Sequence, residues 1–150
     1  MVAVAIIGIV ITVGVVSLNK FGSSQKLEEA REGLIFSLRL ARNYAVTGQS
    51  KEGVVSLRFV TFVVTADGNV NIYPNNRSDW SYLNKDISPD GATITASTLR
   101  FASYDGKLVD SSGIPLDTGV DFTISAGSGM EDPGGDDLMV SVSSSGLINE

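Results

Sequence analysis

The first eighteen residues of the chain form an unbroken apolar run. The segment MVAVAIIGIVITVGVVSL contains no charged side chain, and its only hydroxyl groups belong to Thr12 and Ser17. A run of this length falls within the range that crosses a bilayer as a helix, whereas core strands seldom run so far without a turn signal. A cleavable secretory signal fits less well, because no basic region precedes the run and no A-x-A-like site follows it. The pattern predicts a membrane-type helix.

A second pattern, with helical spacing, begins at Lys26. Apolar residues then recur at intervals of three and four, and charged side chains fill most positions between them. Gly48 stands just past the last periodic residue, where a helix C-cap is common. We expect one helix from about residue 1 to residue 46, with a weak joint at Gly22-Ser23-Ser24. The face expected to pack against the rest of the protein consists of Leu27, Ala30, Leu34, Leu38, Ala41 and Ala45.

From Gly53 onward the pattern changes to that of strands. The segment GVVSLRFVTFVVTA is dense in β-branched and aromatic residues, and Asp67-Gly68 predicts a hairpin turn into NVNIYP. Residues 75–92 are polar and predict a long loop, which we expect Trp80 to hold against the core.

Further strands are predicted in the last third of the chain. TITASTLRFASY reads as one strand that ends at an Asp105-Gly106 turn, and VDFTISA and LMVSVSS form a last pair. Ser145-Gly146 predicts one more turn. A long helix followed by strands in antiparallel hairpins is an α+β arrangement.

The acidic residues gather near the C-terminus. The whole chain has a net charge of −6, while residues 101–150 hold nine carboxylates against Lys107 alone, a net charge of −8. Such a surface repels phosphate backbones, so we expect no nucleic-acid partner. The chain has neither cysteine nor histidine, which excludes a disulfide framework and removes the commonest general base and metal ligand. We therefore expect no catalytic residues and no enzymatic activity.

One short loop concentrates carboxylates. Within residues 131–137, four acidic side chains flank Pro133, Gly134 and Gly135. Oxygen ligands at this density suit Ca²⁺, although the spacing is not that of an EF-hand. Runs of charge are more often solvated surface, so a solvated loop and a calcium site are both open. The ligands of such a site would be Glu131, Asp132, Asp136 and Asp137, and no other cofactor is predicted.

The N-terminal pattern has a family likeness. MVAVAIIGIV, continuing into an amphipathic helix, resembles the type IV pilins and the type II secretion pseudopilins. Residues 38–49, LRLARNYAVTGQ, resemble the end of the helix in the H-type minor pseudopilins, and LRFASYDGKLV and MVSVSSSGLI resemble late strands of that group. The likeness implies an α+β, pilin-like fold, in which a long N-terminal helix with an apolar first half precedes a small antiparallel β-sheet head. Its parts would be an apolar transmembrane or filament-core helix (residues 1–24), its amphipathic continuation (residues 25–48) and the β-rich head (residues 49–150).

The same resemblance implies a structural role. A pilin-like chain is a subunit of a type IV pilus or of a pseudopilus-like filament, assembled through its apolar helix. Its partners would be identical subunits, other pilins, the membrane assembly machinery and, before assembly, the membrane itself. It would sit in the inner (cytoplasmic) membrane and then in an extracellular pilus or periplasmic pseudopilus. The implied filament-core residues are Val2, Val4, Ile6, Ile7, Ile9, Val10, Ile11, Val13, Val15, Val16 and Leu18.

Two alternatives remain beside a main filament subunit. The chain could be a minor pilin or pseudopilin at a filament tip. It could also be a single-pass, membrane-anchored binding module that recognises a secreted substrate or a surface.

Two further features follow from the resemblance. Pilins normally carry a leader peptide and a short segment ending in a glutamate before the apolar run. This sequence begins at Met1, inside that pattern, so we expect the natural chain to start further upstream. Some secretion pseudopilins hold calcium in a late loop, which makes the acidic segment from Glu131 to Asp137 relevant.

Overall fold

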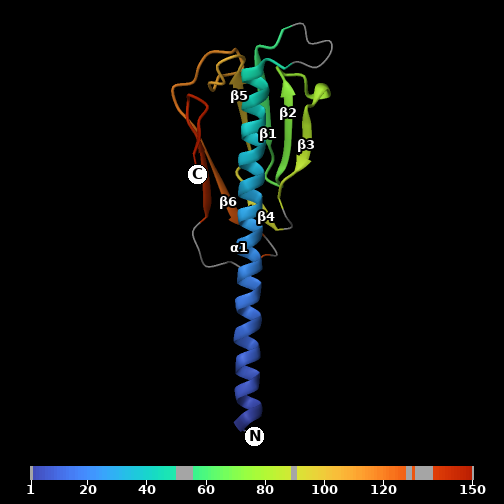
Figure 1. Cartoon of the computed structure of the whole chain (residues 1–150), viewed down its shortest axis with the longest axis vertical. Coiled ribbons are helices and arrows are strands. Elements are labelled where there is room, and N and C mark those ends of the chain that lie inside the picture. The colour runs from blue at the N-terminus through green and yellow to red at the C-terminus, as the bar shows by residue number, and fades with distance from the viewer. Residues whose placement is uncertain (1, 50–55, 89–90, 128–129, 131–136, 150) are drawn as a thin grey trace.

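A computed structural model gives the architecture of residues 2–49, 56–88, 91–127, 130 and 137–149. Described side chains begin at Phe21, so the first part of the helix is known through its backbone alone. Within these residues the elements are one long helix, a short 3₁₀ turn and eight strands in two antiparallel sheets (Figure 1). The fold is therefore α+β, as the order of elements in the sequence predicts.

Helix α1 runs without a break from Val2 to Thr47. Its 46 residues give a length of roughly 70 Å at 1.5 Å per residue. The weak joint expected at Gly22 does not interrupt the helix. Gly48 ends it with a φ of 64° and a hydrogen bond from its backbone N–H to the carbonyl oxygen of Ala45, 3.2 Å away. Glycine is suited to this position because it has no Cβ to clash in the left-handed region.

The first sheet has the strand order β3-β2-β1-β5. Strands β1 and β2 form the expected hairpin around Asp67-Gly68, and β5 pairs with the other edge of β1. Five of the six residues in β1 are buried, as befits a central strand. The bounds of the strands in this sheet are β1 Phe59–Val64, β2 Asn69–Pro74, β3 Leu83–Asp86 and β5 Ser97–Ala102.

The second sheet has the order β4-β6-β7-β8. The last pair of strands predicted from the sequence is confirmed as β6 and β7, and Gly146, with a φ of 76°, turns the chain into β8. The bounds are β4 Ala92–Ile94, β6 Val120–Ala126, β7 Leu138–Val142 and β8 Ile148–Asn149.

The core lies between α1 and the two sheets. Phe62 of β1 and Phe122 of β6 meet edge to face with ring centroids 6.3 Å apart, which joins the sheets directly. Helix α1 packs against strands of both sheets. Figure 1 shows these strands alongside the C-terminal half of α1, while the N-terminal half extends away from the head.

Two predictions about strands were wrong. The segment from residue 93 to residue 104 is not one strand, because the chain crosses between the sheets after β4. Thr95 still donates its N–H to the carbonyl oxygen of Thr123 in the second sheet, whereas Ser97 already pairs with Val64 in the first. Residues 75–92 are not simply a loop either, because they contain the 3₁₀ turn η1 (Ser78–Trp80) and the edge strand β3.

The tryptophan does not hold this segment to the core. Trp80 is half-buried, and the guanidinium of Arg77 lies 4.4 Å above its ring centroid. The anchor is Tyr82, whose ring stacks on Tyr44 of α1 at 4.6 Å and whose hydroxyl donates to the carbonyl oxygen of Gln49 at 2.6 Å.

Asp110 organises the connection between β5 and β6. Its carboxylate accepts the backbone N–H groups of Ile114 and Ser112 at 2.9 and 2.8 Å. These bonds, chiefly the one from Ile114, hold the pKa of Asp110 below its usual value, because they stabilise the charged form.

Candidate interaction surfaces along the helix

The inner face of α1 lies in the core of the head. All six residues assigned to this face from their spacing are buried in the structure. Gly33 also lies close to Ile87, in the segment after β3. A Cβ added at Gly33 would lie 3.1 Å from the Cβ of Ile87, so a glycine here lets the chain after β3 approach the helix. The six inner residues are between 0% and 4% exposed: Leu27, Ala30, Leu34, Leu38, Ala41 and Ala45.

The N-terminal half of α1 is described only as a backbone. The side chains proposed for the filament core, from Val2 to Leu18, lie outside the described residues. Among the described residues, no helix is both long enough and apolar enough to cross a membrane.

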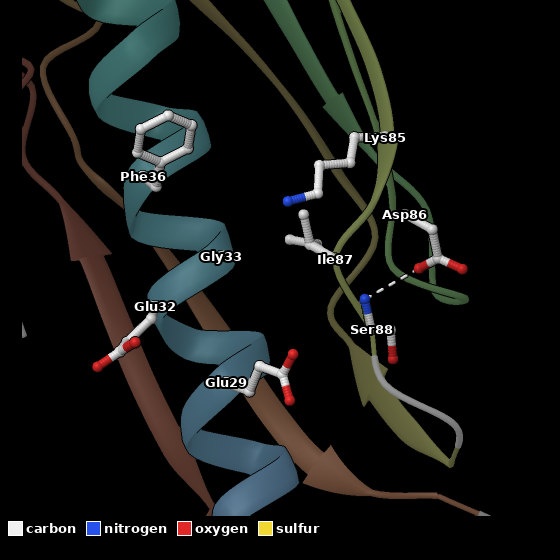
Figure 2. Close-up of a pocket in the computed structure, with 8 residues that line it drawn as sticks. All are labelled: Glu29, Glu32, Gly33, Phe36, Lys85, Asp86, Ile87 and Ser88. Carbon is white, nitrogen blue, oxygen red and sulfur yellow. Dashed lines mark hydrogen bonds between the residues drawn. The ribbon is translucent and has the colours of Figure 1, made fainter.

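A groove of about 520 Å³ separates α1 from the end of β3 and the two residues that follow it (Figure 2). We call it the β3 groove; it is lined by Glu29, Glu32, Gly33, Phe36, Lys85, Asp86, Ile87 and Ser88. Figure 2 shows the Lys85 ammonium directed towards α1 and the Asp86 carboxylate turned away from it. Asp86 instead accepts the backbone N–H of Ser88 at 2.9 Å. The Phe36 ring is 61% exposed, so the groove has an apolar rim beside the carboxylates of the helix.

A second groove, of about 290 Å³, lies between the last turns of α1 and the chain entering β8. We call it the β8 groove; it is lined by Arg39, Arg42, Asn43, Val46, Leu147 and Ile148. Val46 and Leu147 expose 40% and 55% of their surface. Two guanidinium groups beside apolar side chains suit a carboxylate carried by an amphipathic partner.

Two glycine turns enclose the Arg42 side chain. A Cβ at either Gly106 or Gly146 would come within 3.2 or 3.3 Å of the Arg42 Nε atom. That Nε–H group is buried and has no hydrogen-bond partner among the described residues. The fold therefore holds this guanidinium in place by packing, with its charge at the edge of the β8 groove.

Replacing Gly146 with alanine should destabilise the head more than the same change at Gly113. The two glycines have φ values of 76° and 87°, so alanine meets similar backbone strain, about 1–2 kcal/mol, at both. At Gly146 the new Cβ would also overlap the carbonyl oxygen of Gly106, whereas at Gly113 the nearest atom is Arg58 Nη2 at 3.6 Å. We expect Gly146→Ala to lose at least about 1 kcal/mol more in the free energy of urea unfolding. Equal losses would mean that the turn at Gly146 moves aside without cost.

A third groove, of about 430 Å³, lies on the outer face of the first sheet. Because side chains alternate along a strand, the buried Val70 and Ile72 of β2 leave Asn69, Asn71 and Tyr73 on the opposite face. The groove is polar, and its lining residues are Val63, Thr65, Asp67, Asn69, Asn71, Tyr73, Ser78 and Asn84.

The candidate calcium site falls almost wholly outside the described residues. Glu131, Asp132 and Asp136 are not described, and Asp137 is exposed immediately before β7. Within the described part of the chain, no three acidic side chains come together in a way that would hold a metal ion.

Sequence reasoning missed both grooves beside α1. In the sequence, the charged residues Glu29, Glu32, Arg39 and Arg42 only fill positions between the apolar ones of the helix, and Lys85 falls within the predicted loop of residues 75–92. The feature of the sequence that could have indicated these grooves is the spacing of the charges along the helix. The other walls, at Ile87 and Leu147, are contributed by segments that are distant in the sequence.

Comparisons of the chain with protein-family models, with curated proteins and with solved structures found no match.

Proposed function

We propose that this chain is a structural subunit of a helical filament of the type IV pilus or pseudopilus kind. One observation carries the proposal: the C-terminal half of a single 46-residue helix is anchored in a small β-rich head. The other half extends beyond the head (Figure 1), and the residues there have an uncharged, aliphatic sequence up to Leu18. An apolar helix of this length is favoured in an environment other than water, such as lipid or neighbouring apolar helices.

In this proposal, two different environments cover the apolar half in turn. Lipid of the inner membrane surrounds it before assembly, and identical helices surround it in the filament core afterwards. Removing one Val, Leu or Ile side chain from water stabilises a structure by roughly 1.5–3 kcal/mol. Moving the same side chain from lipid to a helix bundle gains far less, so close packing and extraction by the assembly machinery decide the outcome. Gly8 and Gly14 are the small residues in this stretch that permit close approach of neighbouring helices.

The head then forms the outer surface of the filament, in the periplasm for a pseudopilus or outside the cell for a pilus. We assign it no catalytic role, since the chain has no histidine or cysteine. The acidic loop from Glu131 to Asp137 stays a candidate for calcium in this surface.

Electron microscopy of the native assembly tests the proposal. We expect a helical filament whose repeating unit is this chain, with the apolar helices at the centre. Recovery of the chain only as a dispersed membrane protein, with neither a filament nor another pilin bound to it, would contradict a filament role. A single copy at the end of a filament made of another pilin would assign it to the minor subunits.

The alternative of an anchored binding module, or of a tip subunit that binds a substrate, is favoured by the polar groove on the first sheet. Its amide and hydroxyl groups, among them those of Asn69, Asn71 and Tyr73, face away from the core and can exchange hydrogen bonds with a ligand.

A further inference from the structure

The two grooves beside α1 share one pattern of helix positions. The β3 groove takes from the helix Glu29, Glu32, Gly33 and Phe36, and the β8 groove takes Arg39, Arg42, Asn43 and Val46. Each residue of the second set stands ten positions after the corresponding residue of the first. Both sets therefore have the spacing i, i+3, i+4, i+7, which places the four positions of each set on one helix face.

The corresponding residues are complementary in chemistry. A shift of ten residues relates Glu29 to Arg39 and Glu32 to Arg42, so each carboxylate corresponds to a guanidinium. The same shift relates Phe36 to Val46, two apolar side chains that are 61% and 40% exposed. Among the described ion pairs, none includes Glu29 or Glu32.

We propose that a second copy of this chain packs its β8 groove against the β3 groove, parallel to the first and shifted along the helix axis by ten residues. At 1.5 Å per residue the shift is about 15 Å. Glu29 and Glu32 of one copy then face Arg39 and Arg42 of the next, and Phe36 meets Val46. The inference rests on the proposed function, because parallel copies are what a filament with a common apolar core contains.

An unshifted arrangement has the opposite electrostatics. Parallel copies in register that met through the same groove would bring carboxylates next to carboxylates at the β3 groove, or guanidinium groups next to guanidinium groups at the β8 groove, which disfavours association. The shifted contact between unlike grooves replaces either repulsion with an attraction.

The positions of the two grooves also allow the contact to repeat. Ten residues correspond to about 2.8 helical turns, so the two sets face directions about 80° apart. One copy can therefore use its β3 groove and its β8 groove at the same time, with two different neighbours. A contact between two unlike surfaces of this kind continues into an open helical assembly rather than stopping at a dimer.

Cysteine cross-linking tests the shift, because the natural sequence contains no cysteine. Copies carrying Glu29→Cys are mixed with copies carrying Arg39→Cys during assembly in membranes and then oxidised. We expect a covalent dimer from the mixture and little from either variant alone, since a disulfide requires Cα atoms within about 7 Å. A dimer from Glu29→Cys alone in the same yield, or no dimer from the mixture, would overturn the proposed shift.

A charge exchange gives a second readout at the same pair, whose residues are both exposed. We expect Glu29→Arg and Arg39→Glu each to lower the extent of assembly about tenfold or more, because like charges then face each other. The two changes in one chain should restore assembly. Filaments formed equally well by both single variants would refute the pairing while leaving the filament role intact. If the unaltered chain forms no filament, the filament role fails, and the cross-link alone decides whether copies pack with this shift.

Discussion

Ile9→Asp should abolish filament assembly while leaving the head folded. Ile9 lies at the middle of the uncharged stretch that ends at Leu18, so the proposal places it deep in lipid before assembly and deep in the filament core afterwards. An aspartate at the centre of a membrane helix costs about 2.5–3.5 kcal/mol on insertion scales. The same cost would recur in every subunit of a filament, because each subunit would bring one carboxylate into the apolar core. Negative-stain electron microscopy should find no filaments.

Ile9→Leu is the matched control, since it changes the shape of the side chain but not its charge, and filaments should persist. Membrane fractionation and circular dichroism of the solubilised chain then separate the possible causes of a loss. Aspartate variants that reach the membrane with a folded head but do not assemble support the assignment of the core. Normal filaments from Ile9→Asp would show that this part of α1 does not lie in a filament core.

The helix could be predicted closely because its determinants are local. The spacing of Leu27, Leu34 and Leu38 fixes one face, and Gly48 marks the end one residue beyond Thr47. The hairpin at Asp67-Gly68 could be predicted equally well, because a turn signal between two β-rich segments indicates that the flanking strands pair with each other.

The division of strands into two sheets could not be predicted in this way. β-propensity indicates a strand but not its partner, and the change of sheet between Ile94 and Ser97 depends on contacts with Thr123 and Val64, which are distant in the sequence. Strand β3 was missed because it is an edge strand whose Asn84, Lys85 and Asp86 are all exposed. Its amino acids read as a loop until the pairing with β2 is known.

The grooves could be predicted in part from the sequence. The ten-residue repeat of charged and apolar positions along α1 is visible in the sequence alone. The grooves form because Ile87 lies along one side of the helix and Leu147 along the other, where each contributes to the opposite wall. Both flanking segments reach α1 only through long-range folding.

Leu34→Ala should strongly destabilise the head. Leu34 is 0% exposed and belongs to the core cluster in which α1 meets both sheets. Truncating a buried leucine removes its transfer free energy and leaves a cavity, with losses of about 2–5 kcal/mol. Neighbouring Leu27 and Leu38 are buried as well, and a tightly packed helix can fill the cavity only by moving its backbone. Urea unfolding of the solubilised full chain should therefore show a midpoint far below that of the unaltered protein.

Phe36→Ala supplies the matched control, because it removes a larger side chain from the same helix at a position that is 61% exposed. Surface substitutions of this kind usually change the free energy of unfolding by less than about 0.5 kcal/mol. In the proposed contact between copies, however, Phe36 packs against Val46 of a neighbour, so this variant should assemble poorly although its head is as stable as before. The two variants thus separate the two faces of α1: Leu34→Ala reports how the helix holds the head, and Phe36→Ala reports how the head-bearing helix meets another copy. If Leu34→Ala were as mild in urea as Phe36→Ala, the helix would not be part of the core of the head.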